Sequence, residues 1–338
     1  MFFSAAYLFK RMKLLINDST DPAFNLALEE LIASELSEEI VMLWRNAPAV
    51  IVGRNQNTEA EIDAEAVRER GIKVVRRITG GGAVYHDLGN INYTIAANDR
   101  QLDTEAFSRN AKIIIDVLRG MGVDAGFHGR NDILVDGRKI SGSAKSVFTD
   151  RTLFHGTLLF DTDLSVLGKV LTPDEEKIKA KGIKSVRSRV ANLKEFLPEW
   201  DVECFLQELI SGLCKVLGLD SASPIPGYLI EKAEVLANEK YRSWQWNFGS
   251  NTGYTYHCRR RFPSGSVEVR FEVKDNRIAG MVFYGDFFGL APASELADKL
   301  NGLCPSFEEI SKVLKNTDVS EYISGVSADD LLTLFRLG

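Results

Sequence analysis

The sequence lacks the features that would mark a metal-dependent scaffold, a membrane protein or a secreted protein. It has only four cysteines, Cys204, Cys214, Cys258 and Cys304, and four histidines. The cysteine spacings match no zinc motif, redox motif or disulfide scaffold. No apolar run is long enough to cross a bilayer. The chain opens with apolar residues followed by basic ones, the reverse of a secretory signal. We therefore expect a cytoplasmic protein without membrane contact or a structural transition metal.

An excess of basic residues is also missing. The 338 residues include 41 Lys and Arg against 47 Asp and Glu, which gives a net charge of -6. This balance argues against a nucleic-acid partner. With 45% hydrophobic residues the composition is that of a globular protein with one or two domains. Met12 opens a more regular stretch, so we interpret residues 1–11 as an N-terminal extension.

Apolar runs rich in β-branched residues alternate with helical patterns, which predicts a mixed α/β (α+β) fold. The composition changes near residue 247, so we expect a first domain over 1–247 and a small α/β domain over 248–338. Strands are predicted at 13–16, 40–44, 49–53, 72–78, 90–97 and 153–160, and hairpins turn at Asp136-Gly137 and Asp275-Asn276. Helices are predicted from Pro22 and at 63–70, 104–122, 172–182, 201–217, 228–239, 292–302, 306–315 and 327–335.

The stretch RRITGGGAVYHD, residues 76–87, contains three consecutive glycines. It is not a Walker loop, because no Gly-Lys-Ser/Thr follows, and not a dinucleotide fingerprint, because a strand comes next. A hairpin turn between strands is one interpretation. An anion site is the other, because consecutive glycines expose backbone N–H groups. Arg76 and Arg77 precede the glycines on opposite faces of a strand, so one of them can point into such a site.

A second segment, GRNDILVDGRKISGSA at 129–144, combines polar and small residues. Lys139 beside small residues suits a carboxylate or phosphate partner. The alternative is a solvated strand lysine, since lysines are mostly exposed. Asp132 fits a single carboxylate ligand of Mg²⁺ in a nucleotide site, or an ordinary turn residue.

Two further segments carry less specific signals. His155 in FHGTLLF is either a core histidine or part of a site. Six basic residues and no acid stand between Lys177 and Arg189 in KIKAKGIKSVRSRVANL. That run fits a solvated face, a nucleic-acid contact or a basic flap over a phosphorylated ligand. All four segments together fit one anionic, nucleotide-like ligand.

In this order and spacing, the four segments resemble the lipoate–protein ligase A family. SWQWNFG at 243–249, followed by a small domain, resembles the long bacterial form. The resemblance covers nearly the whole chain from Lys13. It implies a biotin/lipoate protein ligase-type catalytic domain, with packed helices on a mixed sheet, and an accessory C-terminal domain. Phe154 departs from the pattern, because a histidine is familiar at that position.

The resemblance also implies roles for individual residues. It makes Lys139 the catalytic residue, in contact with both the lipoate carboxylate and the phosphate, and Asp132 a ligand of Mg²⁺. Lipoate binding is implied for Gly82, His86, Lys139, His155 and Gly156. We expect the His86-Asp87 pair to be structural first, and Lys181 to Arg189 to close over the intermediate. ATP or adenylate binding is implied for Arg77, Thr79, Gly81, Gly82, Ala83, Val84, Tyr85, Asn90, Asn131, Lys139, Lys181, Arg187 and Arg189.

The implied reaction has two steps, with ATP and lipoate as reactants and Mg²⁺ as a cofactor. Lipoate and ATP give lipoyl-AMP and pyrophosphate, and the lipoyl group then passes to a lysine of a lipoyl domain. The implied acceptors are the E2 subunits of 2-oxoacid dehydrogenases and the glycine-cleavage H protein, and we expect a monomer. Positive charge held at Lys139, Arg77 and Mg²⁺ would offset the repulsion between the two anions that the first step joins.

Three alternative functions would require other residues or a different use of the same ones. An octanoyltransferase of the same fold needs a nucleophilic cysteine near Lys139, and no cysteine precedes Cys204. A biotin ligase would carry a GRGRxGR-type loop instead of TGGGAVYHD. A non-catalytic protein that binds lipoyl-adenylate stays an alternative, which the presence of both Lys139 and Asp132 disfavours.

Overall fold

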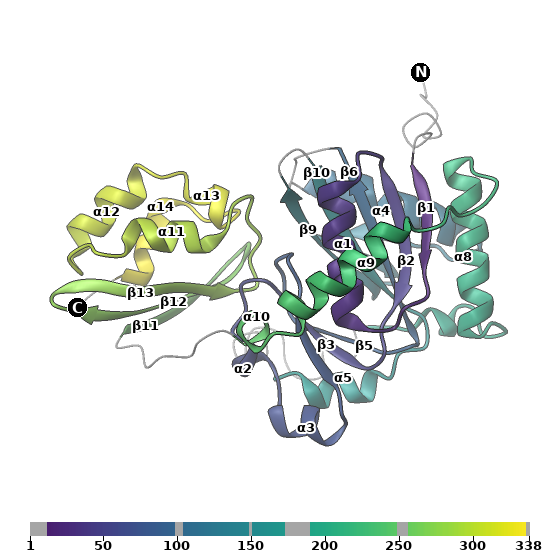
Figure 1. Ribbon diagram of the computed structural model, residues 1–338, viewed down its shortest axis with the longest axis horizontal. Coiled ribbons are helices and arrows are strands. Elements are labelled where there is room, and N and C mark those ends of the chain that lie inside the picture. Colours follow the sequence, from purple (N-terminus) through teal and green to yellow (C-terminus); the bar gives the residue numbers. More distant parts are fainter. Residues whose placement is uncertain (1–11, 99–103, 149–150, 173–189, 249–255, 336–338) are drawn as a thin grey trace.

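The computed structural model describes residues 12–98, 104–148, 151–172, 190–248 and 256–335. These residues form two lobes (Figure 1). The larger lobe contains the described chain up to residue 248, and the smaller lobe contains the chain from residue 256. The mixed α/β prediction is confirmed.

A seven-stranded mixed sheet forms the centre of the larger lobe. Its first two strands are parallel, and the other neighbouring pairs are antiparallel. Apolar β-branched runs predicted most of these strands, since such residues pack well on a pleated sheet. The spatial order is β1 (Lys13–Asn17), β2 (Ile40–Arg45), β6 (Asn90–Ala97), β10 (Arg151–Leu159), β9 (Arg138–Phe148), β8 (Asp132–Val135) and β7 (Gly126–His128).

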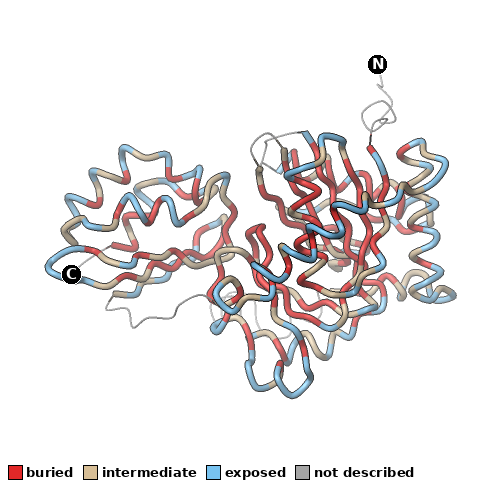
Figure 2. The backbone as a smooth tube through the Cα atoms, viewed as in Figure 1, coloured by how far each residue is buried: buried red, intermediate tan, exposed pale blue. Residues whose placement is uncertain are grey.

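Helices cover both faces of this sheet (Figure 1). One face packs against α1 (Pro22–Glu35) and α9 (Gly227–Leu236), which continues into the π-helical turn η3 (Ala237–Tyr241). The other face packs against α4 (Thr104–Gly120) and α8 (Val202–Leu217). The sheet is therefore buried on both sides, and every residue of β6 is buried (Figure 2).

A second, three-stranded sheet corrects the hairpin interpretation of the glycine stretch. Its order is β4 (Lys73–Arg76), β3 (Ala49–Val52) and β5 (Val84–His86). Because β3 pairs with β4 in parallel and with β5 antiparallel, the two outer strands never meet. The glycines therefore lie in a loop that crosses the end of β3. Three helices, α2 (Thr58–Glu61), α3 (Ala64–Glu69) and α5 (Leu164–Val170), complete this part of the lobe.

The smaller lobe has its own sheet and its own core. The hairpin between its second and third strands turns at Asp275-Asn276 as predicted, and both residues have φ above +45° (50° and 57°). The strands are β11 (Tyr256–Phe262), β12 (Gly265–Lys274) and β13 (Arg277–Gly285). The helices are α11 (Ala293–Leu300), α12 (Phe307–Lys315), α13 (Val319–Tyr322), α14 (Ala328–Leu332) and the 3₁₀ turn η4 (Thr333–Phe335).

The two lobes contact each other near the glycine loop. Phe288 of the smaller lobe is 5% exposed and packs in the core of the larger one, with its ring centroid 5.6 Å from that of Phe107. The short helix α10 (Trp244–Asn247) ends the larger lobe beside β4. Two predicted features lie outside the described residues, namely most of the helix at 172–182 and the extension at 1–11.

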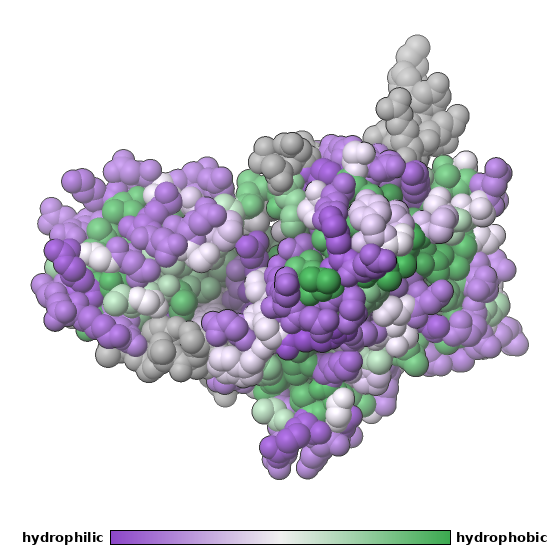
Figure 3. All heavy atoms as spheres, in the orientation of Figure 1, coloured by the Kyte–Doolittle hydropathy of each residue, from purple (hydrophilic) through white to green (hydrophobic). Residues whose placement is uncertain are grey.

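The surface in view mixes polar and apolar residues, with apolar side chains along α9 standing among polar ones (Figure 3). Among the described residues, no helix has both the length and the apolar character that a bilayer span requires.

Candidate active site

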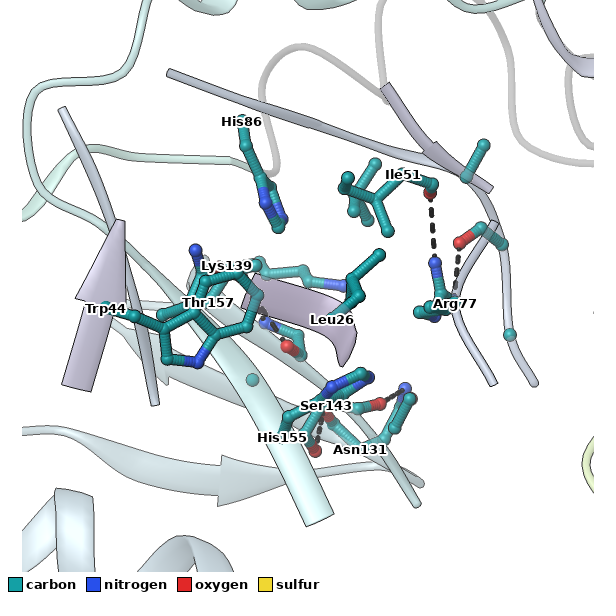
Figure 4. A pocket seen from close by; sticks show the side chains of 18 residues that line it. Leu26, Trp44, Ile51, Arg77, His86, Asn131, Lys139, Ser143, His155 and Thr157 are labelled. Carbon is teal, nitrogen blue, oxygen red and sulfur yellow. Dashed lines mark hydrogen bonds between the residues drawn. The ribbon is translucent and has the colours of Figure 1, made fainter. Parts of the chain in front are cut away.

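A cavity of about 180 Å³ lies between the large sheet and the three-stranded sheet. Trp44 and His86 stand on one side of it and Arg77 on the opposite side (Figure 4). The residues that line it are Leu26, Trp44, Ile51, Arg77, Gly81, Gly82, Ala83, Val84, His86, Asn92, Asn131, Lys139, Gly142, Ser143, Ala144, His155, Gly156 and Thr157.

The strand register fixes the direction of the cavity. Trp44 on β2 faces Asn92 on β6, which faces Thr157 on β10, and β9 with Gly142 is the next strand. Neighbouring strands lie ~4.8 Å apart, so these three steps span about 14 Å. The cavity thus runs across the strands from a Trp44 end to a Gly142 end.

The Gly142 end carries opposite charges on one hairpin. Lys139 Nζ lies 2.7 Å from Asp132 Oδ1, and the two side chains are 37% and 34% exposed. The turn between β8 and β9 places them together, because Asp136 and Gly137 both have positive φ, as a tight type I′ turn requires. This confirms the predicted hairpin. The pair remains accessible to a ligand in the cavity.

The backbone around Lys139 is held by two further segments. Ala191 N–H donates to the carbonyl of Lys139, so the chain directly after the predicted basic loop returns to this strand. Asn131 Nδ2 donates to the Ser143 carbonyl at 2.5 Å, and Ser143 N–H donates to the Asn131 carbonyl at 2.9 Å. Asn131 is thereby fixed beside Lys139.

The guanidinium of Arg77 holds the glycine loop in shape. It is 5% exposed and donates to the carbonyls of Ile51, Gly80 and Gly82 and to Thr79 Oγ1, at 2.7–3.0 Å. Four of its five N–H groups are thus used within the protein. Burial lowers the pKa of Arg77 to about 10, so it stays charged at neutral pH. Among the described residues, one N–H group on Nη1 has no hydrogen-bond acceptor.

The three glycines serve different purposes. Gly81 has φ of +92°, which L side chains rarely adopt. A Cβ atom on Gly80 would lie 2.2 Å from the Phe287 carbonyl oxygen of the smaller lobe. Gly82 alone faces open space, with no atom within 4 Å of its Cβ position. Backbone exposure toward a ligand is therefore concentrated at Gly82.

Arg76 points away from the cavity. Its side chain is 7% exposed and donates to the backbone carbonyls of Gly53, Gln56, Trp246 and Asn247, among others. It therefore anchors α10 to β4. The alternation of the two arginines follows from the two-residue period of the strand.

A buried chain of hydrogen bonds connects helix α1 to the glycine loop. Glu29 Oε1 lies 3.0 Å from His155 Nδ1, and His155 Nε2 lies 2.8 Å from Thr79 Oγ1. Thr79 in turn accepts from Arg77 Nε. Thr94 Oγ1 donates to the same Glu29 oxygen and accepts from Trp44 Nε1 at 2.8 Å. One carboxylate thus fixes both a wall of the cavity and the loop that crosses it.

The lining includes an apolar wall of Leu26, Ile51 and Val84, which pack in the same apolar cluster as Trp44. His86 is 4% exposed and lies edge-on to Trp44, with 6.4 Å between the ring centroids. Burial, with smaller contributions from the charges of Arg77 and His155, lowers the pKa of His86 to about 3. The ring is therefore neutral at physiological pH.

The structure brings most of the residues implied by the resemblance into this cavity, but not all. Asn90 is fully buried outside the lining and donates to Asn92 Oδ1 at 2.9 Å. The Tyr85 side chain packs in the core beside α3 and α5, and burial raises its pKa to about 12. Asp87 is a turn residue that accepts from Gly89 and Asp163 N–H. Lys181, Arg187 and Arg189 lie outside the described residues.

Several residues that line the cavity or hold its lining side chains were not predicted from the sequence. Glu29 and Trp44 lie in segments read only as apolar helix and strand. A signal for Asn92 and Thr94 was available, because NINYTI alternates polar and apolar side chains although the whole strand is buried. A buried strand with a polar face indicates that this face lines a site.

The metal prediction rests on one carboxylate. Among the described residues no group of three or more His, Cys, Asp or Glu side chains could enclose an ion. Asp132, one-third exposed beside Lys139, fits the usual pattern in which Mg²⁺ is held by one or two carboxylates and by the phosphates of its nucleotide. None of the four cysteines lines the cavity.

Comparisons with known sequences agree over both lobes. Residues 21–214 match the family model of the lipoyl protein ligase A/B catalytic domain, and residues 251–335 match that of the bacterial lipoate protein ligase C-terminus. The lipoate-protein ligase LplJ of Bacillus subtilis is 38% identical over 322 residues, covering 93% of this chain and 96% of the relative. Lipoate–protein ligase 1 of Staphylococcus aureus is 37% identical over 332 residues, covering 96% and 99%.

Solved structures show the same likeness. P. falciparum LipL1 in complex with lipoate superimposes with a TM-score of 0.73 at 28% identity, covering 90% of this chain and 94% of that one. A lipoate-protein ligase A bound with ATP gives a TM-score of 0.61 at 28% identity, covering 71% and 99%.

Proposed function

The chain belongs to the lipoate–protein ligase family of enzymes, and we propose that it activates lipoate with ATP and transfers the lipoyl group to a lysine of a lipoyl domain. The observation that carries this proposal is the asymmetry of the cavity. One end offers Lys139, Asp132 and the open backbone of Gly82, which suit a carboxylate and a phosphate. The other end is apolar and suits the acyl chain.

In the first step an oxygen of the lipoate carboxylate attacks the α-phosphorus of ATP. A new O–P bond forms, and the bond to pyrophosphate breaks. Lys139 would hold both anions, and Gly82 and Arg77 line the same cavity. Fixed donors of this kind stabilise the developing charge without reorganisation. Asp132 would hold Mg²⁺, which supplies further neutralisation of the triphosphate.

In the second step the amine of the acceptor lysine attacks the acyl carbon, AMP leaves with the bonding electrons, and the amine loses a proton. The mixed anhydride is already reactive, so no enzyme nucleophile is needed. The protein has to exclude water and orient the amine. We propose that residues 1–247 perform both steps, and that residues 248–338 act as an accessory domain that supports the glycine loop. E2 subunits of 2-oxoacid dehydrogenases and the H protein are the proposed acceptors.

Lipoate-dependent pyrophosphate release is the direct test. The native chain should release pyrophosphate when ATP and lipoate are both present, and should then add a lipoyl group to a purified lipoyl domain, detected by mass spectrometry. Lys139→Ala should lower the first rate roughly 10²–10³-fold, the usual cost of one lost electrostatic donor. Lys13→Ala is the matched control, because Lys13 pairs with Glu38 at the surface and does not line the cavity.

Two outcomes would refute the proposal. Acyl transfer without ATP would indicate the octanoyltransferase reaction instead, although no cysteine lines the cavity. Binding of lipoyl-AMP without turnover would indicate a non-catalytic binding protein.

A further inference from the structure

The Trp44 end of the cavity contains a hydrogen-bond donor that no described protein atom accepts. His86 Nε2 is buried and has no partner within the described part of the chain. The other ring nitrogen, Nδ1, lies 3.1 Å from Asn46 Nδ2. Figure 4 shows the imidazole directed from β5 toward the middle of the lining residues. A buried polar atom without a partner costs free energy, so such an atom facing a cavity indicates a ligand.

A chain of amides fixes which ring nitrogen carries the proton. Asn25 Nδ2 lies 2.9 Å from the carbonyls of Ser19 and Arg45, and carbonyls only accept. The same nitrogen lies 2.9 Å from Asn46 Oδ1, so the Asn46 nitrogen faces His86. An amide nitrogen only donates, so Nδ1 of His86 accepts. The proton of the neutral ring is therefore on Nε2, which makes this atom a donor.

The position of His86 predicts which part of a bound lipoate its Nε2–H group would meet. His86 lies against Trp44 on β2, whereas Lys139 Nζ stands over Gly142 on β9, three strands away. The strands that carry Trp44 and Gly142 are about 14 Å apart at the usual strand spacing, which leaves room for an extended lipoate with a polar contact at each end. A carboxylate held at Lys139 therefore places the dithiolane ring beside His86, between Leu26, Ile51 and Val84.

We propose that His86 Nε2–H donates a hydrogen bond to a sulfur of the dithiolane ring, and that this contact selects lipoate over saturated acids of the same shape. The inference rests on the proposed function, since it takes lipoate as the occupant. Disulfide sulfur, like thioether sulfur, is a weak acceptor, whereas a hydrocarbon ring leaves the donor unpaired. A site with a buried polar group discriminates against analogues that cannot pair with it.

The test compares two ligands on the native protein without ATP, by titration calorimetry. The first is lipoate, and the second is 5-cyclopentylpentanoate, in which two methylene groups replace the sulfurs. Lipoate should bind roughly two- to tenfold more tightly, the range that corresponds to one net hydrogen bond. Equal dissociation constants would overturn the inference. They would show that the sulfur atoms of lipoate make no net hydrogen bond with His86.

Two variants assign the preference to the side chain. His86→Phe fills similar space without a donor, so the ratio of the two dissociation constants should fall to about one. His86→Gln retains an amide donor and should keep most of the ratio. His128→Phe makes the same substitution at an exposed position outside the cavity and should leave the ratio unchanged. An unchanged ratio in His86→Phe would contradict the proposal, and the ligand comparison on the native chain decides it if that variant fails to fold.

This experiment separates the inference from the proposed function. If neither acid binds and no lipoate-dependent pyrophosphate is released, the proposed function fails. If the enzyme is active and both acids bind equally, only the role of His86 fails.

Discussion

The ammonium of Lys139 lies directly against Gly142, which is three residues further along the same strand, β9. A Cβ atom on Gly142 would stand 2.7 Å from Lys139 Nζ and 2.9 Å from Cε. Such distances are below any van der Waals contact, so a side chain here must displace the lysine. The space for the ion pair between Lys139 and Asp132 therefore depends on a glycine at this position.

Gly142→Ala is expected to lower kcat/KM for lipoate-dependent pyrophosphate release by roughly a hundredfold, since a displacement near 1 Å costs this much in an oriented site. Gly142 has no positive φ, so the melting temperature should change little. Gly126→Ala is the matched control, because no atom lies within 4 Å of its Cβ position. Full activity of Gly142→Ala would show that the observed position of Lys139 is not the working one.

Glu29 is expected to couple the acyl cavity to the glycine loop through His155 and Thr79. Its side chain is 1% exposed and accepts from both His155 and Thr94. Glu29→Gln replaces one of the two carboxylate oxygens with an NH₂ group and removes the negative charge, which disrupts the chain of hydrogen bonds. Thr79→Val breaks the same chain at its other end. Because both changes remove one network, their effects on kcat/KM should be non-additive by about 0.5–3 kcal/mol.

A double-mutant cycle measures this coupling. Glu38→Gln, which changes an exposed carboxylate paired with Lys13, should add to Thr79→Val without coupling. Additive effects for Glu29→Gln and Thr79→Val would mean that the two residues act independently.

Local turn chemistry explains which parts of the site were predictable. The hairpin with Asp132 and Lys139 was predicted, because Asp136-Gly137 specifies its turn within a few residues. The contact between His155 and Glu29 was not predicted. Glu29 is 126 positions away in the sequence, and only the packing of α1 on the sheet brings it to His155. Tertiary contacts of this kind leave no local pattern in one sequence.

The three-stranded sheet also left no local pattern in the sequence. The strand Val84–His86 is only three residues long, too short for a periodic pattern. Its partner is β3, which precedes it by more than thirty residues, and the sequence shows only glycines between two apolar runs. A hairpin was the simplest interpretation of those glycines, and the crossover exists because β3 can pair on both of its edges.

Phe288 is expected to support the glycine loop from the smaller lobe. Its ring lies 3.0 Å from the Cβ position of Gly80, and the guanidinium of Arg130 lies 4.7 Å from its centroid. Phe288→Ala removes this packing, and buried Phe→Ala changes cost about 3–5 kcal/mol. We expect the KM for ATP to rise, because the loop backbone loses its support, with a smaller effect on the KM for lipoate.

Steady-state kinetics with each substrate varied separately test this expectation. Phe307→Ala, at an exposed position of the same lobe, is the control. Equal changes in both KM values, or none, would contradict a specific contact between Phe288 and the loop.

The buried neutral ring of His86 is expected to make stability depend on pH. Its pKa of about 3 in the folded protein lies below the ordinary value of 6.5 that applies when the chain is unfolded. The unfolded chain therefore binds more protons between these values, and the free energy of unfolding falls as the pH drops below 6.5. One such group contributes about 1.4 kcal/mol per pH unit in this window. Carboxylates also titrate in this pH range, so the comparison with a variant isolates the contribution of His86.

Urea unfolding of the native chain and of His86→Phe at pH 7 and pH 5 provides the measurement. Between pH 7 and pH 5 the native chain should lose about 2 kcal/mol of unfolding free energy relative to the variant. His128→Gln, at an exposed position, is the matched control and should follow the native chain at both values. A difference that stays constant between pH 7 and pH 5 would mean that His86 is protonated, or accessible to water, in the folded protein. In that case the ring would carry protons on both nitrogens near pH 5, and its hydrogen bond from Asn46 could not persist there.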